Sequence, residues 1–125
     1  MSEYFIEHDA IVETVQRYID GCKNGKSALM RPAFHPEAKF FGYADDTLAT
    51  ETAFLFDYID KNGPSPDIET RFVAIDIAES IATVRLEVEN FSGALAGSGV
   101  HMSDFFTLIK TDEGWRITQK SFHWH

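Results

Sequence analysis

Asp104 is the carboxylate whose position in the sequence most clearly favours acid–base chemistry. It interrupts the apolar stretch 100–109. On the inner face of a sheet its carboxyl group would lose hydration, which raises a carboxyl pKa and suits a general acid or base. We predict a catalytic set of Asp104, His123 as its proton partner, and Tyr18 as a hydrogen-bond donor. The alternative is a structural carboxylate that is paired with Lys120 or Arg71, or hydrogen-bonded to the backbone.

The pairing of Asp104 with His123 depends on the hairpin formed by the last quarter of the chain. Two apolar-rich runs there flank a turn that contains Asp112 and Glu113. If these two residues form a two-residue loop, His123 lies on the same sheet face as Asp104. The acid–base pair would then stand at one end of an apolar surface, as expected for a small-molecule site.

Gly114 allows a second register for the same hairpin. In a three-residue loop with Gly114 in the left-handed conformation, the pairing shifts by one residue. Asp104 would then share a face with Lys120 and Phe122, and His123 would turn away. The glycine favours this register chemically, but the pattern leaves both open.

The second register also brings three histidines to one face, His101, His123 and His125. Three imidazoles at this spacing could hold zinc or another divalent ion. The alternative is a polar chain end, or an interface at which the rings stack. We predict no metal and no cofactor.

Four further side chains are predicted to line a ligand pocket. Tyr43 carries a hydroxyl on an aromatic ring, and Phe106 follows Asp104 on the same face. Arg71 and Asn90 are expected on the inner faces of two neighbouring strands, at the ends far from the turn that joins them. They would therefore stand at the mouth of a pocket. An aromatic ring surface with a few polar groups suits a small apolar or aromatic ligand with a polar head.

Helical and strand periodicities predict the elements that position these residues. Apolar residues at helical spacing predict an amphipathic helix over residues 3–24, ended by Gly25. Shorter helices are expected from Ser27 to about residue 34 and from Thr50 or Thr52 to residue 61, with a short strand between them. Residues 68–79 and 81–91 form a hairpin, because alternating apolar residues match across a turn at residues 79–80. Residues 92–99 are a small-residue loop before the last hairpin.

This element order predicts an α+β fold. Three helices come first, interrupted by a strand, and four long antiparallel strands follow. A long sheet twists and curls, so we expect a cone-shaped antiparallel sheet packed on three N-terminal helices, of the cystatin-like roll type. The chain of 125 residues is expected to form a single domain over residues 1–125.

Composition excludes several classes of partner. The net charge is −9 at pH 7, with no compensating basic stripe, so we expect neither nucleic acid nor an anionic membrane as a partner. The absence of a signal-like segment predicts a cytoplasmic protein. The one cysteine, Cys22, lies on the buried stripe of the first helix, which favours a core thiol over a reactive one.

The chain resembles the nuclear transport factor 2-like (NTF2-like) superfamily, and within it the small polyketide-cyclase-like and lumazine-binding-like bacterial domains. The resemblance is carried by residues 15–19 with 24–25, by residues 34–38, and by the segments 104–110 and 114–122. It implies the fold and a pocket. Members of the superfamily include isomerases, dehydratases, cyclases and transport adaptors. Tyr18 matches the hydrogen-bonding tyrosine of ketosteroid isomerase, whereas the position of that enzyme's base falls on Gly42.

Two functional hypotheses follow. The first is a domain that binds a small molecule, with isomerase-, dehydratase- or cyclase-like acid–base chemistry. The second is a non-catalytic module that forms a homodimer through the outer sheet face or sequesters a ligand. The second is motivated by apolar residues on both faces of the last two strands.

Overall fold

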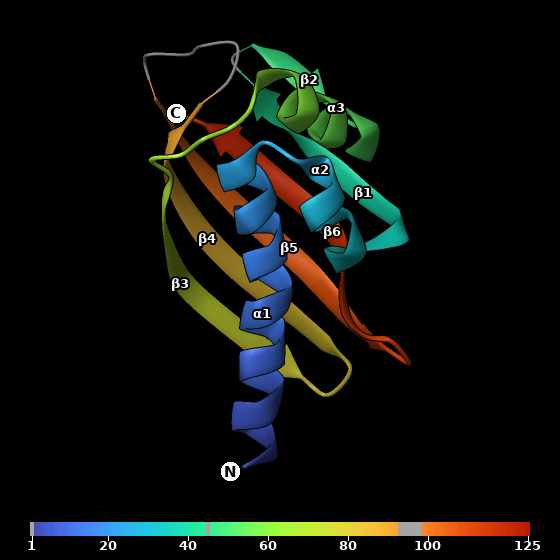
Figure 1. Ribbon diagram of the computed structural model, residues 1–125. Coiled ribbons are helices and arrows are strands. Elements are labelled where there is room, and N and C mark those ends of the chain that lie inside the picture. The colour runs from blue at the N-terminus through green and yellow to red at the C-terminus, as the bar shows by residue number, and fades with distance from the viewer. Residues whose placement is uncertain (1, 45, 93–98) are drawn as a thin grey trace.

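The structure is a computed structural model that describes residues 2–44, 46–92 and 99–125. Figure 1 shows the path of the chain, whose elements run in this order: α1 (Glu3–Asn24), α2 (Ser27–Met30), the 3-10 helix η1 (Arg31–Ala33), β1 (Phe34–Ala44), β2 (Thr47–Ala49), α3 (Thr52–Asn62), β3 (Glu69–Ala78), β4 (Ile81–Phe91), β5 (Val100–Thr111) and β6 (Gly114–Trp124). Most of the loop predicted for residues 92–99 lies outside the described residues.

Capping residues at both ends set the limits of helix α1. The Ser2 hydroxyl accepts a hydrogen bond from the Phe5 amide and caps the first turn. Gly25 adopts the left-handed conformation that closes the last turn, with φ of 67°. Ile11, Val15 and Tyr18 form part of the buried stripe. The predicted helix over residues 3–24 is confirmed.

The second predicted helix is divided into two short pieces. Helix α2 ends at Met30, and Pro32 lies in the 3-10 turn that follows, because proline fits the first turn of a helix better than its interior. The Asp60 carboxylate of α3 accepts hydrogen bonds from the Ser27 amide at 2.8 Å and the Ser27 hydroxyl at 2.7 Å. These bonds tie α3 to the start of α2.

The described strands form one six-stranded sheet in the order β2-β1-β6-β5-β4-β3. Neighbours are antiparallel except for β1 and β6, which are parallel. The predicted α+β class and curled sheet on three helices are therefore confirmed, but the sheet is mixed rather than wholly antiparallel. The sequence pattern does not reveal the β1–β6 pair, because its two strands lie far apart in the chain.

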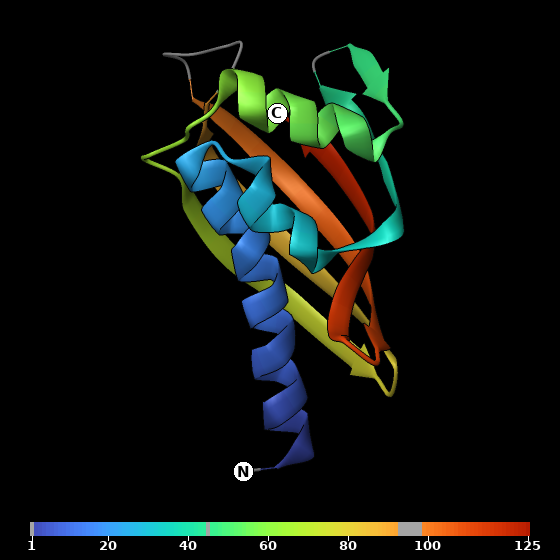
Figure 2. The same ribbon diagram turned by 45° about the vertical axis from the view of Figure 1, so that its right-hand side comes forward.

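The helices cover one face of the sheet, and no helix among the described residues covers the other. Figure 1 shows α1 lying along the inner face of the strands, and Figure 2 shows α3 crossing the end where the C-terminus lies. The core is packed between α1 and the inner side chains of β4, β5 and β6. No helix among the described residues has the length and apolarity needed to cross a lipid bilayer.

Register shifts in four strand pairs change which side chains face the core. In the β3–β4 pair, Val73 is an extra residue between Phe72 and Ala74, so Phe72 rather than Val73 pairs with Leu86. The other three shifts lie between Phe34 and Lys39 of β1, between Val88 and Phe91 of β4, and at Thr118 of β6. The predicted partners Ile75–Val84 and Ile77–Ala82, nearer the turn, are confirmed.

The burial of Cys22 leads to a test of the native packing. Its side chain has no exposed surface, and burial raises the pKa of the thiol to about 12. At pH 8 the folded protein should therefore hold about a thousandfold less thiolate than an ordinary cysteine of pKa about 8.5. We expect no reaction with Ellman's reagent in buffer and one thiol per chain in 6 M guanidinium chloride. A fast, stoichiometric reaction of the folded protein would contradict the packing around α1.

Candidate functional site: a buried tyrosine, aspartate and lysine

Three polar side chains meet in the core below α1. The Tyr18 hydroxyl donates a hydrogen bond of 2.9 Å to Asp104 Oδ2, and Lys120 Nζ lies 3.0 Å from Asp104 Oδ1. The exposed fractions are 0% for Tyr18 and Asp104 and 1% for Lys120. Asp104 thus lies between a phenol and an ammonium group, out of contact with bulk water. We call these three residues the buried triad.

The last hairpin brings Asp104 and Lys120 to the same face by an unexpected route. Near the turn the strands pair as for a two-residue loop, with Thr111 opposite Gly114. Thr118 is then an extra residue in β6, and beyond it the pairing is shifted by one, so that Asp104 lies opposite Phe122. The outer half of the hairpin therefore has the second of the two predicted registers, produced by a bulge at Thr118 rather than by a longer loop.

Electrostatics keep Tyr18 protonated and raise the pKa of Asp104. Burial raises the pKa of Asp104 more than the Lys120 charge and the hydrogen bond from Tyr18 lower it. Burial, together with the neighbouring Asp104 charge, raises the pKa of Tyr18 well above its ordinary value. Tyr18 is consequently a hydrogen-bond donor at any physiological pH. The raised pKa of Asp104 is the direction expected of a buried carboxyl group that can act as a general acid or base.

Lys120 is surrounded by aromatic rings rather than by acceptors. Its Nζ lies 4.5 Å from the ring centre of Phe122, 4.6 Å from that of Phe40 and 5.2 Å from that of Tyr18. Cation–π contacts of this kind stabilise an ammonium group that has lost its water. Within the described part of the chain, Asp104 is the only carboxylate paired with Nζ. Among the described residues, Nζ therefore has one carboxylate acceptor for its three N–H groups.

A narrow aromatic hollow adjoins the triad. Tyr18 and Lys120 contribute to its wall, and α3, β1, β4, β5 and β6 supply the other lining residues: Phe40, Phe54, Leu55, Tyr58, Phe91, Met102, Phe122 and Trp124. Its free space is about 10 Å³, which is room for about one water molecule. A larger ligand can enter only if the rings at the mouth move. These are Phe54, 37% exposed, and the half-buried Tyr58 and Trp124.

His123 does not meet Asp104. It lies opposite Ser103, is exposed, and faces the outer side of the sheet. The predicted placement of His123 beside Asp104 is therefore wrong, because the bulge at Thr118 reverses the facing of every later residue in β6. Tyr18 does lie against Asp104, as predicted, and the Phe106 ring packs on Tyr18 with ring centres 5.3 Å apart.

The remaining predicted ligand residues are not gathered around the hollow. Tyr43 is half exposed and does not line it. Arg71 lies opposite Glu87 and is exposed, because the bulge at Val73 turns it to the outer face. Asn90 has a left-handed φ of 60°, and its amide donates to the Asp67 carbonyl oxygen at 3.2 Å. The inward placement predicted for these three residues is wrong.

The structure also explains why position 42 holds glycine. A Cβ atom added to Gly42 would lie 2.2 Å from the Phe122 ring and 2.3 Å from its carbonyl oxygen. No side chain fits there without displacing β6. Phe122 thus occupies the space that a catalytic carboxylate at position 42 would need, which makes the base of the ketosteroid isomerase pattern sterically incompatible with this chain.

Lys120 is the site residue for which the sequence pattern predicts only a structural role. The signal that could have identified Lys120 is its place in the alternation of β6. Lys120 and Phe122 are buried, and the residues on either side of them are more exposed. That alternation can be assigned to the inner face only when the position of the bulge is known.

A second, wider depression of about 480 Å³ lies between the start of α1 and the β3–β4 turn, but its walls do not include any residue of the triad.

Comparisons with known proteins agree with this architecture. The family model described as "Putative lumazine-binding" matches residues 6–123. Three helices on a curled, open sheet define an NTF2-like fold, and the chain belongs to this lumazine-binding-like family within it. The resemblance to the NTF2-like superfamily and to its lumazine-binding-like domains is confirmed.

Solved structures and a curated relative extend the comparison. An NTF2-like protein of unknown function from Shewanella baltica is 34% identical, with a TM-score of 0.87, covering 100% of this chain and 98% of the other. A similar protein from Methylobacillus flagellatus is also 34% identical, with a TM-score of 0.86 and coverages of 100% and 95%. The aldolase FrzH of Cladobotryum is 28% identical over 118 residues, covering 94% of this chain and 90% of that protein.

The coupling of Asp104 to Lys120 can be measured by a double-mutant cycle. In Asp104→Asn the buried ammonium loses its counter-charge, and we expect the free energy of unfolding to fall by about 3–5 kcal/mol. In the double variant with Lys120→Met no buried charge remains, so the loss should be smaller than in Asp104→Asn alone. Urea unfolding followed by fluorescence measures all four proteins.

The exposed Lys39 of the neighbouring strand β1 offers a matched control. Lys39→Met should change the free energy of unfolding by less than about 0.5 kcal/mol. If the losses from Asp104→Asn and Lys120→Met simply add in the double variant, the two side chains do not interact as the structure indicates.

Proposed function

We propose that this protein binds a small, largely apolar carbonyl compound in the aromatic hollow and acts on it through the buried triad. The observation that carries the proposal is the enclosure of Asp104 between Tyr18 and Lys120 next to that hollow. A buried lysine beside a proton acceptor and a phenol donor suits chemistry at a carbonyl carbon. The lumazine-binding description of the family and the aldolase name of the Cladobotryum relative both fit a pocket for a small organic molecule.

In this proposal each member of the triad has a different task. Lys120 can pass a proton to Asp104 Oδ1, 3.0 Å away, and Oδ1 accepts no directed hydrogen bond from the other described residues. The resulting amine attacks the carbonyl carbon and a C–N bond forms. The carbonyl oxygen takes one proton from Tyr18, which Asp104 Oδ2, 2.9 Å away, replaces with the proton taken from Lys120, and it takes a second proton from the attacking nitrogen. The C–O bond then breaks, water leaves, and the nitrogen keeps one proton in the new C=N bond. The product is an imine on Lys120, which makes the adjacent C–H bonds more acidic.

The surroundings of Nζ support this role for Lys120. An amine becomes a nucleophile only after it loses a proton, and Asp104 Oδ1 is the acceptor within reach of Nζ, 3.0 Å away. The three rings around Nζ exclude water, which would otherwise hydrolyse an imine. The surrounding walls are aromatic and apolar, so they favour an aryl or cyclic substrate over a charged one.

Reductive trapping tests both parts of the proposal. The protein is incubated with benzaldehyde, cyclohexanone or 2-tetralone, and sodium cyanoborohydride then converts any imine into a stable secondary amine. We expect one adduct per chain, mapped by peptide mass spectrometry to Lys120. The adduct should be absent in Lys120→Met, at least about tenfold weaker in Asp104→Asn, since proton transfer contributes at least this much, and undiminished in Lys39→Met.

A thermal-shift measurement with the same compounds separates binding from chemistry. A raised melting temperature without an adduct would contradict the imine step but keep the pocket. Neither a shift nor an adduct, or labelling spread evenly over surface lysines, would contradict both.

A second candidate function, self-association through the outer sheet face, is favoured by one observation. This face exposes three aromatic side chains at 43–54% of their surface, Phe41, Tyr43 and Phe105. Exposed aromatic rings on a bare sheet face are typical of protein–protein contact surfaces. A second copy of this chain would cover the face of both subunits by twofold symmetry.

Charging the centre of this face should disrupt such a dimer. We expect Phe105→Glu to convert a dimer into a monomer in analytical ultracentrifugation. The control is Phe5→Glu, because Phe5 is equally exposed, at 60%, but lies on α1. A wild-type protein that is monomeric at about 100 µM, or a dimer indifferent to Phe105→Glu, would contradict this contact.

A further inference from the structure

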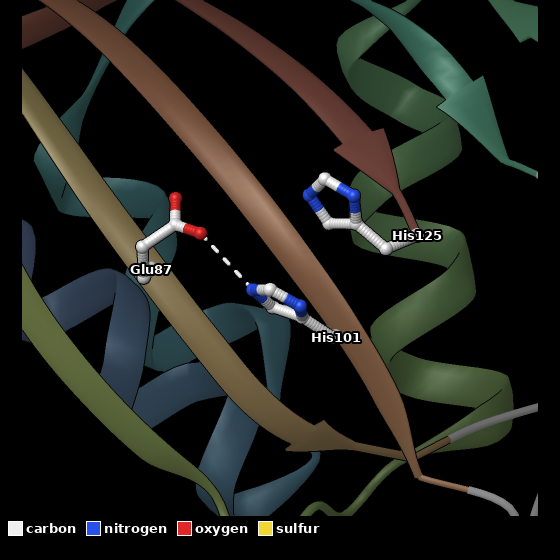
Figure 3. Close-up of side chains that lie close together, drawn as sticks. All are labelled: Glu87, His101 and His125. Carbon is white, nitrogen blue, oxygen red and sulfur yellow. Dashed lines mark hydrogen bonds and ion pairs between the residues drawn. The ribbon is translucent and has the colours of Figure 1, made fainter.

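We propose that Glu87, His101 and His125 form a binding site for a divalent transition-metal ion on the outer face of the sheet. The three side chains come from β4, from β5 and from the residue that follows β6, and Figure 3 shows them pointing toward one another. One ligand atom from each lies within 4.8 Å of the other two. Two imidazoles and a carboxylate are a donor set that suits Zn²⁺, Cu²⁺ or Ni²⁺.

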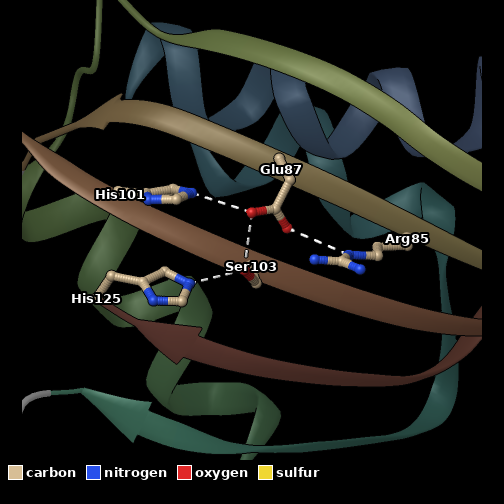
Figure 4. A network of polar contacts seen from close by, with 5 residues as sticks. All are labelled: Arg85, Glu87, His101, Ser103 and His125. Carbon is tan, nitrogen blue, oxygen red and sulfur yellow. Dashed lines mark hydrogen bonds and ion pairs between the residues drawn. The ribbon is translucent and has the colours of Figure 1, made fainter.

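One pair of the proposed ligand atoms already has the spacing that a metal requires. His101 Nε2 lies 3.0 Å from Glu87 Oε1, and the Ser103 hydroxyl lies 2.9 Å from the same oxygen and 2.8 Å from His125 Nε2. Ligands about 2.0–2.1 Å from a metal lie about 2.9–3.4 Å from one another in square or tetrahedral geometry. Figure 4 shows Ser103 between the carboxylate and His125, where its hydroxyl can orient both ligands.

Strand pairing holds these residues in place. Glu87 lies opposite Ser103 in the β4–β5 pair, and the His125 amide donates a hydrogen bond of 2.8 Å to the His101 carbonyl oxygen. The His101 and His125 rings stack with their centres 4.4 Å apart. Three backbone segments thus fix the site, and only the imidazole rings need to turn. His101 remains 47% exposed, so that an ion can enter from solvent.

Neighbouring groups favour the charged form of the Glu87 carboxylate. Burial opposes ionisation of Glu87, but hydrogen bonds from Ser103 and His101 and the charge of Arg85 outweigh it, so the pKa of Glu87 lies below its ordinary value. Arg85 Nε lies 3.5 Å from Oε2, which leaves Oε1 directed at the histidines. The net charge of −9 attracts cations in general.

The hydrogen bonds define what must change when the ion binds. The Ser103 hydroxyl gives its one proton to Glu87, so His125 Nε2 must be the donor in its bond to Ser103, and His101 Nε2 donates to Glu87. Both rings therefore carry a proton on Nε2. A metal needs the Nε2 lone pair, so binding must move the ring proton of both histidines to Nδ1.

Calorimetric titration with ZnCl₂ tests the site, and His123 supplies the matched control. His123 lies on the same face, with its ring centre 4.9 Å from that of His125, but it is not part of the ligand set. We expect one Zn²⁺ per chain. Affinity should fall more than about 100-fold in His101→Gln, His125→Gln and Glu87→Gln, about 10-fold in Ser103→Ala, and not in His123→Gln.

Two-dimensional NMR of the ring nitrogens gives a second readout. On addition of Zn²⁺, His101 and His125 should switch from the Nε2–H to the Nδ1–H tautomer, while His123 keeps its spectrum. The proposal is overturned if the three ligand variants bind Zn²⁺ as the wild type does, if His123→Gln loses affinity equally, or if one ion binds per two chains with dimer formation. Unchanged tautomers at saturating Zn²⁺ would also overturn it.

Discussion

The enclosure of the Asp104–Lys120 ion pair is the constraint on which the inner half of this structure depends. Removing two charges from water costs several kcal/mol per ion, and the mutual attraction offsets this cost only with additional polar partners. Tyr18 supplies one hydrogen bond to the carboxylate, and three aromatic rings face the ammonium. Because Tyr18 belongs to α1 and the rings to β1, β6 and α1, the pair is satisfied only when the helix is docked on the sheet.

This requirement also limits the volume of the hollow. The rings of Phe40 and Phe122 stack with centres 4.6 Å apart and occupy the space around Nζ. The side chains that shield the ion pair from water are thus the same ones that narrow the pocket. A ligand must displace the outer rings on α3, whose ends are fixed by the bond of Thr52 to Ala38 and by the bonds of Asp60 to Ser27.

The sequence predicts those parts of the fold that depend on local chemistry. The cap at Ser2, the stop at Gly25 and the alternation of β4 act within a few residues, so the helix and hairpin limits follow from pattern alone. Bulges cannot be predicted in this way, because a single extra residue does not show in the hydrophobic periodicity of the sequence. The bulge nevertheless turns every later side chain of the strand to the opposite face of the sheet. For this reason Tyr18 and Asp104 could be identified, whereas the orientations of Arg71, Asn90 and His123 could not.

The bulge at Thr118 connects the two faces of the sheet. Without it, the pairing near the turn would continue, and Lys120 would lie opposite Phe105 on the outer face while His101 lay opposite Trp124. With it, Lys120 turns inward to Asp104, and His125 comes to lie beside His101. One inserted residue therefore assembles both the buried triad inside and the histidine–glutamate cluster outside, so neither arrangement can change register without the other.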